Sequence, residues 1–169
     1  MRRLLDGLYD GCAWAAAVSM VAILLVILVQ VFGSAIGVYV RGTDAYAGYA
    51  MASASFFALA HTLTRGEHIR VTLFMDKAPP GLRRVLELWC LGAAVALSAA
   101  FAYYSWDMVW WSYAYNDVSS AQDETPLWIP QLTMAIGVTV LTVAFLDQLV
   151  AVLTGRGMAQ DDGSLKAME

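Results

Sequence analysis

Charged residues are scarce in this chain of 169 residues. Asp, Glu, Lys and Arg together make up 14% of it, whereas about 25% is usual for soluble domains. Apolar residues make up 60% of the sequence. Four long segments contain no charged residue at all, namely 12–40, 45–64, 88–106 and 125–146. This composition argues against a soluble globular domain.

Cysteine is also rare, and the sequence lacks the usual motifs of catalysis. Cys12 and Cys90 are the only two cysteines, too few for a disulfide framework or a metal quartet, so we interpret both as buried small residues. There is no glycine-rich phosphate loop, no nucleophile motif, no metal-ligand spacing and no basic stripe for nucleic acid. The sequence therefore predicts neither an enzyme nor a nucleic-acid-binding protein.

The four uncharged segments have the length of membrane-spanning helices. About 20 residues, rising about 1.5 Å each, cross the roughly 30 Å hydrocarbon core of a bilayer. Residues 22–29 are continuously apolar, whereas the strands of a membrane barrel alternate, so helices are the remaining option. We predict an all-α integral membrane protein with a single four-helix domain over 1–169 and spans at about 13–40, 45–65, 84–112 and 127–153.

The basic residues indicate how these spans are oriented. The first apolar run is longer than the 7–15 residues of a signal-peptide core, so we expect it to be retained. Arg41 is then the only basic residue on one side of the membrane. The other side carries Arg2, Arg3, Arg65, Arg70, Lys77, Arg83, Arg84, Arg156 and Lys166. By the positive-inside rule, both termini are predicted to be cytoplasmic.

Two segments outside the hydrocarbon core also have a characteristic composition. The connection 65–84 is predicted to lie on the cytoplasmic side, and within it 68–75 mixes apolar and basic residues as an interfacial segment does. Seven aromatic residues lie within 103–115, at the outer end of the third span. They are typical of an anchoring belt, and a docking surface for an extracytoplasmic partner is the alternative.

An independent carrier would need a polar site near the middle of the membrane. Gln30 is the only strongly polar residue deep in the first span, while Asp107 and Asp147 lie near the ends of theirs. An autonomous pump is therefore disfavoured. His61 and His68 are seven residues apart, which puts them on nearly the same face of a continuing helix. This pair cannot supply both axial ligands of one haem, although a haem shared with a partner remains an alternative.

Small residues at helix-packing spacing occur in two of the predicted spans. Gly33 and Gly37 are four residues apart in the first, and Gly92, Ala96 and Ala100 follow the same spacing in the third. Such spacing allows backbones to approach closely in lipid. We expect these ridges to mediate contacts within the chain or with another subunit.

Two short motifs resemble a known family. Residues 65–71, Arg-Gly-Glu-His-Ile-Arg-Val, lie at the cytoplasmic end of the second span, and residues 125–131, Thr-Pro-Leu-Trp-Ile-Pro-Gln, precede the fourth, with Gly137 following. Together, in a four-span chain of this size, they resemble the small membrane subunit (DctQ-like small permease) of the tripartite ATP-independent periplasmic (TRAP) transporters. The resemblance covers nearly the whole chain.

The resemblance implies a helper function. In that family a periplasmic substrate-binding protein captures an organic acid, and a large membrane subunit carries it inward by symport with sodium. The small subunit packs beside the large one as a fixed scaffold. The chain is thus expected to be a non-catalytic subunit in the bacterial cell inner membrane, with the large subunit, the binding protein and membrane lipids as partners. No cofactor is expected in this chain, because sodium would bind the large subunit.

Candidate residues for contact with a partner or with lipid follow from both lines of reasoning. The ridge in the first span and the family motifs supply most of them, and Arg41 and Asp44 stand near the place where the family often has a Trp with paired acids. The complete set is Gly33, Gly37, Arg41, Asp44, Arg65, Gly66, His68, Ile69, Arg70, Val71, Trp128, Pro130 and Gln131. The alternative function is a membrane anchor for a redox or other enzyme complex.

Overall fold

Four helices account for most of the described chain. The structure, a computed structural model, describes residues 2–38, 41–64, 80–121 and 123–154. The helices are α1 (Arg2–Ala35), α2 (Thr43–Thr64), α4 (Pro80–Ala114) and α5 (Trp128–Leu153). Within the described ranges, the only β pairing is an isolated bridge between Val118 and Pro126. The predicted all-α class is thus confirmed for this part of the chain.

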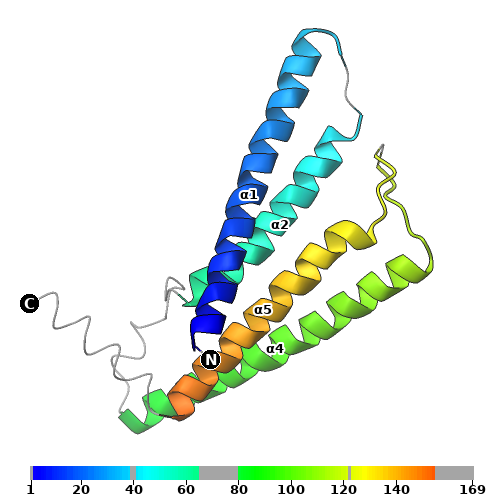
Figure 1. The fold of residues 1–169 in the computed structure, drawn as a ribbon. Coiled ribbons are helices and arrows are strands. Elements are labelled where there is room, and N and C mark those ends of the chain that lie inside the picture. Colours follow the sequence, from blue (N-terminus) through cyan, green and yellow to red (C-terminus); the bar gives the residue numbers. More distant parts are fainter. Residues whose placement is uncertain (1, 39–40, 65–79, 122, 155–169) are drawn as a thin grey trace, which may run out of the picture.

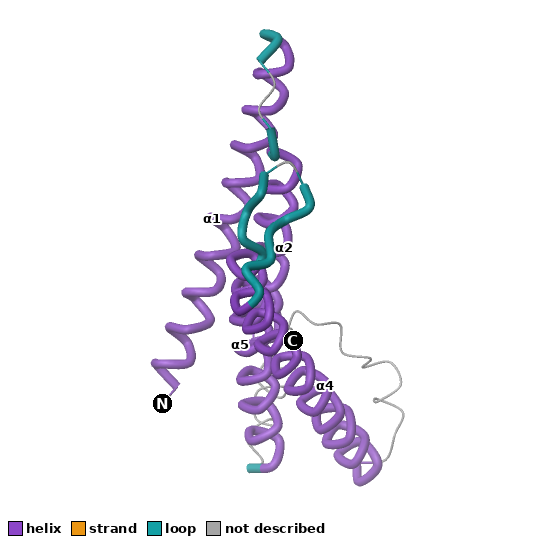
Figure 2. The backbone as a smooth tube through the Cα atoms, turned by 90° about the vertical axis from the view of Figure 1, so that its right-hand side faces the viewer, coloured by secondary structure: helices purple, strands orange, loops and turns teal. Residues whose placement is uncertain are grey.

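The helices form a row of two antiparallel hairpins. α1 packs against α2 and α4 packs against α5, while α2 and α5 join the hairpins, which gives the spatial order α1, α2, α5, α4 (Figure 1). The turn after α1 and the loop between α4 and α5 lie at one end of the row, which we term the loop end (Figures 1 and 2). The N-terminus lies at the opposite end. α1 and α4 therefore each have only one principal neighbour.

A glycine ends α1 earlier than the predicted span, which extends to residue 40. Gly37 has a φ of +76°, a left-handed conformation that glycine adopts without steric cost. The Val38 N–H donates to the Gly33 carbonyl at 2.8 Å, and the Gly37 N–H donates to the Ser34 carbonyl at 3.2 Å. These two bonds form a Schellman motif, which satisfies carbonyls that the helix end leaves unpaired. Gly33 and Gly37 therefore do not form one helical ridge, contrary to the prediction.

The same motif ends α4, with asparagine in place of glycine. Asn116 has a φ of +52°, and asparagine tolerates this region better than most residues. The Asp117 N–H donates to the Ser112 carbonyl at 3.0 Å, and the Asn116 N–H donates to the Tyr113 carbonyl at 3.3 Å. The chain then turns into the loop that leads to α5.

Prolines mark the beginnings of the two helices of the second hairpin. α4 begins at Pro80, and Pro130 is the third residue of α5. The first N–H groups of a helix have no partner within the helix, so a proline there loses no hydrogen bond. The two prolines therefore stand at helix positions where they cost no hydrogen bond.

Three of the four helices are long and apolar enough to cross a membrane. The qualifying segments are Gly7–Ala35, Arg84–Ala114 and Trp128–Leu153. α2 is long enough at 22 residues, but it carries alanine, serine, threonine and glycine where the other helices carry leucine, valine and isoleucine. Its length fits the predicted second span. Unlike the other three helices, however, it has no stretch of 18 residues that is apolar enough to count as a candidate membrane span.

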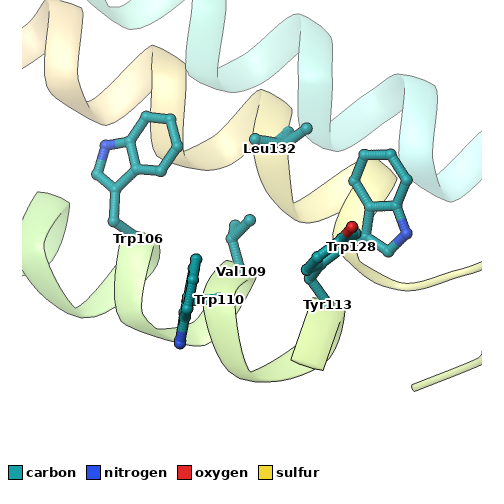
Figure 3. A pocket seen from close by; sticks show the side chains of 6 residues that line it. All are labelled: Trp106, Val109, Trp110, Tyr113, Trp128 and Leu132. Atoms are coloured by element: carbon teal, nitrogen blue, oxygen red, sulfur yellow. The ribbon is translucent and has the colours of Figure 1, made fainter. Parts of the chain in front are cut away.

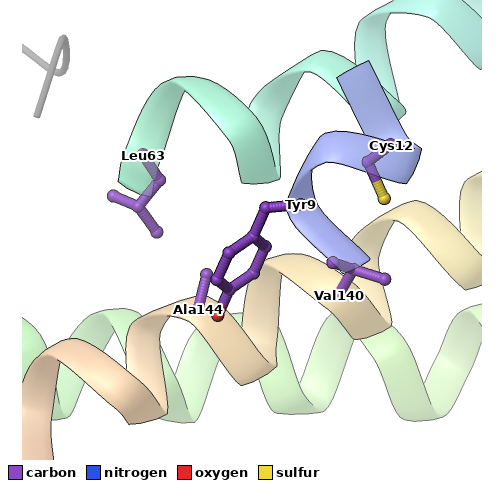
Figure 4. Packing of buried hydrophobic residues seen from close by; sticks show 5 residues of the cluster. All are labelled: Tyr9, Cys12, Leu63, Val140 and Ala144. Carbon is purple, nitrogen blue, oxygen red and sulfur yellow. The ribbon is translucent and has the colours of Figure 1, made fainter. Parts of the chain in front are cut away.

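The interior of this row is small. Val138 and Ser105 are the largest side chains that are fully buried. One apolar cluster, made by Tyr9, Cys12, Leu63, Val140 and Ala144, brings α1, α2 and α5 together near the N-terminus (Figure 4). Many large apolar side chains of α1 and α4 are exposed. Exposed apolar surface of this extent suits contact with lipid or with another membrane protein.

Candidate functional site

The loop end holds a set of contacts that tie the two hairpins together. The Tyr49 hydroxyl on α2 donates to the Ser119 hydroxyl at 2.9 Å, and the Thr125 hydroxyl donates to the Tyr46 hydroxyl at 3.3 Å. Within the loop, the Ser119 N–H donates to the Thr125 carbonyl at 2.8 Å. We refer to these four residues, together with Gly42 and Asp123, as the loop clasp.

Gly42 packs against Asp123 with no room for a side chain. A Cβ atom at position 42 would lie 2.7 Å from the Cβ of Asp123, and Gly42 has a φ of +79°. Both the space and the backbone conformation therefore require glycine here. The pKa of the Asp123 carboxyl lies below its usual value, chiefly because of the nearby Thr125 hydroxyl; burial opposes this shift, and the Ser119 hydroxyl, the Asp123 backbone N–H and the Tyr49 hydroxyl contribute less. The carboxylate form is therefore favoured at this junction. Neither carboxylate oxygen has a hydrogen bond of good geometry among the described residues.

The middle of the row joins the same two hairpins through α2 and α5. The Ser53 hydroxyl donates to the Thr133 hydroxyl at 3.0 Å. Gly137 on α5 lies so close to Phe56 on α2 that a Cβ at position 137 would be 2.8 Å from the Phe56 Cβ and 2.9 Å from its carbonyl carbon. The two backbones approach closely at this point, as small residues permit between membrane helices.

The third connection lies near the N-terminus. Tyr9 of α1 points between α2 and α5, beside Leu63 and Ala144 (Figure 4). The Gln148 side-chain amide on α5 donates to the Leu63 carbonyl near the end of α2, at 3.0 Å. The hairpins are thus held together at both ends and in the middle.

An apolar cavity of about 180 Å³ lies between α4 and α5 near the loop end (Figure 3). Its lining residues are Trp106, Val109, Trp110, Tyr113, Trp128 and Leu132. The Trp106 indole N–H donates to the Thr139 hydroxyl at 3.0 Å, and the Tyr113 and Trp128 rings meet edge to face with centroids 5.9 Å apart. The cavity therefore offers aromatic contact rather than polar chemistry. Among the described residues, no three His, Cys, Asp or Glu side chains are grouped as a metal site.

The predicted site residues around the first turn all lie where the chain reverses between α1 and α2. Gly33 and Gly37 form the end of α1, as described above. Arg41 is exposed in the turn. Asp44, in the first turn of α2, accepts a hydrogen bond at 2.7 Å from the side-chain amide of Gln30 on α1. The polar residue deep in the first predicted span therefore pairs with an acid of the second helix.

The predicted residues at the start of α5 lie together, whereas the other motif is outside the described residues. Trp128 lines the aromatic cavity. The Pro130 carbonyl accepts from the Thr133 hydroxyl at 2.7 Å. The Gln131 side-chain oxygen is buried and has no hydrogen-bond partner among the described residues. Arg65, Gly66, His68, Ile69, Arg70 and Val71 all fall in the range 65–79, which the structure does not describe.

Sequence reasoning missed the residues that hold the hairpins together. The sequence places three of them, Ser119, Asp123 and Thr125, in a polar loop, and nothing in it indicates that Tyr49 is their partner. Gly42 is the exception. It lies in the short connection between two predicted spans, where a glycine often has a positive φ, so the sequence does indicate a tight turn at this residue. The Gly137 contact depends on which helices are neighbours, and no local pattern specifies that.

Comparison with known families gives a match over most of the chain. The family described as "Tripartite ATP-independent periplasmic transporters, DctQ component" matches residues 11–155. The matched range includes all of α2, α4 and α5 and most of α1. No curated protein matches the chain significantly.

Proposed function

The chain belongs to the family of DctQ components of the tripartite ATP-independent periplasmic transporters, and from this premise we propose that it is a non-catalytic scaffold for the large transport subunit. In this role it supports sodium-driven uptake of an organic acid without contacting the acid or the sodium ion. Family membership makes it a membrane component of a transporter rather than a member of an enzyme class. The family match favours a transporter subunit over the alternative of a membrane anchor for a redox or other enzyme complex.

One observation carries the scaffold proposal: the two hairpins are joined at three levels. The loop clasp joins them at one end, the Ser53–Thr133 and Phe56–Gly137 contacts in the middle, and the Tyr9 cluster at the other end. Relative motion of the hairpins would have to break several of these contacts together. A subunit of this kind gives a moving partner a fixed surface to move against.

We further propose that all four helices cross the bacterial inner membrane, with both termini in the cytoplasm. In this arrangement α2, the antiparallel neighbour of α1, also crosses the membrane and so provides the crossing beyond the three candidate spans. The distribution of the basic residues supports the orientation. Reporter fusions test this arrangement. A reporter fused at residue 169 should report a cytoplasmic location, and a reporter inserted within 119–122 should report a periplasmic one. The reverse pattern would contradict the orientation.

Reconstituted uptake tests the function itself. Proteoliposomes that contain the large subunit, with the periplasmic binding protein outside, should take up substrate along a sodium gradient only when this chain is present. Asp107→Asn and Asp147→Asn should leave the sodium dependence and the substrate preference unchanged, because the scaffold holds neither ligand. Full uptake without this chain would contradict the proposal, as would a changed substrate preference in either variant.

A further inference from the structure

The aromatic cavity between α4 and α5 plays no part in joining the two hairpins. Three of its lining side chains, Trp106, Trp110 and Tyr113, are 45%, 66% and 60% exposed. Figure 3 shows the four aromatic side chains around this space, with Val109 and Leu132 between them. The rings therefore surround an opening on the outside of the row and do not close over a core.

The cavity lies where two candidate membrane spans end together. Trp110 and Tyr113 belong to the last turns of the span Arg84–Ala114, and Trp128 is the first residue of the span Trp128–Leu153. Tryptophan and tyrosine are typical of the boundary between the hydrocarbon core and water. In a bilayer this is the level of the lipid head groups.

Aromatic side chains grouped around a space can bind organic cations. The face of each ring carries partial negative charge, and tryptophan attracts a cation most strongly. In this cavity of about 180 Å³ several rings already have fixed positions. The Trp106 indole N–H is bonded to Thr139, and the Tyr113 and Trp128 rings meet edge to face. The site is thus largely formed before any ligand enters.

The charge of the second hairpin also favours a cation. Between Arg84 and Arg156 the sequence has six acidic residues and no lysine, arginine or histidine. Arg41 belongs to the turn of the first hairpin, where the next residue, Gly42, packs against Asp123. An anionic group at the second hairpin would therefore be repelled, whereas a cation would be attracted.

Two of these acids adjoin residues that line the cavity. Asp107 follows Trp106 on α4 and is exposed. The Asp117 carbonyl accepts from the N–H of Leu127 at 3.0 Å, which puts Asp117 beside the residue that precedes Trp128. Asp117 is exposed as well. The rings thus stand in a negatively charged part of the surface, a combination that an acyl chain alone does not require.

We propose that the aromatic cavity binds the ammonium group of a zwitterionic phospholipid, such as phosphatidylethanolamine. The ammonium ion lies among the rings at the membrane boundary, and the acyl chains of the same lipid follow the exposed apolar side of α4 into the membrane. This inference rests on the part of the proposed function that places α4 and α5 across the membrane. It adds a lipid site and the chemistry of the head group.

A comparison of two lipids with identical acyl chains tests the head group. The purified chain, stripped of lipid in detergent, is mixed with dioctanoyl phosphatidylethanolamine or with dioctanoyl phosphatidylglycerol, and native mass spectrometry measures how much of each stays bound. The ethanolamine lipid should bind at least fivefold more tightly. Equal binding would mean that the cavity takes an acyl chain whatever its head group, and would overturn the proposal.

Substitution of one ring tests the site. Trp110→Leu removes a ring face and keeps an apolar side chain, so it should weaken binding of the ethanolamine lipid about fivefold and leave the glycerol lipid unchanged. Trp110→Phe should restore part of the difference. Trp89→Leu is the matched control on the same helix, because Trp89 is 73% exposed and does not line the cavity. An equal loss in Trp89→Leu would overturn the assignment to this cavity.

A pair of probes separates the charge from the shape of the ligand. Dodecylphosphocholine carries a trimethylammonium group, and its 3,3-dimethylbutyl analogue has the same shape without the positive charge. The charged probe should displace bound phosphatidylethanolamine at a concentration several times lower than the neutral one. Asp117→Asn should reduce this advantage. Equal displacement by the two probes would show that charge plays no part, and would overturn the proposal.

These outcomes are distinct from those that test the proposed function. If the reporter fusions give the reverse orientation or uptake does not need this chain, the proposed function fails, while the lipid preference is still measured in detergent. If those tests succeed and the two lipids bind equally, only the inference is overturned. A loss of the large subunit or the binding protein in Trp110→Leu, with the lipid preference unchanged, would assign the cavity to a protein side chain and would also overturn it.

Discussion

At the scale of single residues, the contacts that shape the molecule depend on backbone conformation and on a few hydroxyl groups. Gly37 and Gly42 both have positive φ angles, and each sits where the chain reverses between α1 and α2. Gly37 closes the end of α1, whereas Gly42 makes room for Asp123. Gly37 therefore determines where α1 ends, and Gly42 allows the loop of the second hairpin to pack against the turn of the first.

Gly37→Ala should destabilise the protein by about 1 kcal/mol, because a Cβ is strained in the left-handed region. Gly11→Ala is the control, since Gly11 lies within α1 and a Cβ there meets nothing within 4 Å. That change should be neutral or should stabilise by up to about 1 kcal/mol. Thermal unfolding of the purified variants in detergent measures both. An unchanged stability for Gly37→Ala would contradict the assigned role of Gly37 in ending α1.

The lowered pKa of Asp123 predicts that the loop clasp loosens in acid. The pKa in the folded state lies below the ordinary value of about 3.9. The stabilisation by the carboxylate is therefore complete above that value and is lost as the pH falls through the folded-state pKa. A spin label at Ser120, which is exposed in the same loop, should become more mobile on this titration. In Asp123→Asn this transition should be absent. A wild-type midpoint above 3.9 would contradict the assignment.

At the scale of helices, the sequence predicts the elements well and their neighbours poorly. The apolar segments locate α4 and α5 to within a few residues, because this signal is local. The end of α1 differs from the prediction, since the apolar run continues past Gly37 and only the backbone conformation of that glycine ends the helix. The contact of α2 with α5 is invisible in the sequence, because it joins residues about 80 positions apart.

Gly137→Ala tests that contact between α2 and α5. The added Cβ would lie 2.8 Å from the Phe56 Cβ, so the two backbones would have to separate. Overpacking of this kind costs about 1–3 kcal/mol. Gly92→Ala is the matched control on α4, where a Cβ has open space, and it should be neutral or slightly stabilising. Equal unfolding temperatures for the two variants would mean that α2 and α5 are not in close contact at Gly137.

At the scale of the whole molecule, a row of helices differs from a closed bundle in how much surface it leaves for others. A bundle encloses its apolar side chains, whereas this row exposes those of α1 and α4 and buries few residues completely. The sequence predicts four apolar segments in either case, so it cannot distinguish the two arrangements. The distinction comes from the pairing of α2 with α5, which keeps α1 and α4 apart at the two ends.

The row should keep one shape throughout the transport cycle. Leu25 on α1 and Tyr103 on α4 are exposed on the two end helices, so spin labels at these positions measure the distance across both hairpins. Domain motions in transporters occur between rigid bodies, and the three levels of contact make this chain one such body.

In the reconstituted transporter, pulsed electron paramagnetic resonance should give the same narrow distribution of distances between the two labels before and after sodium and substrate are added. A control pair within the first hairpin, at Leu25 and Met51, should behave in the same way. If the distance from Leu25 to Tyr103 shifts while the control pair stays fixed, the hairpins move against each other, and the chain then takes part in the motion instead of bracing it.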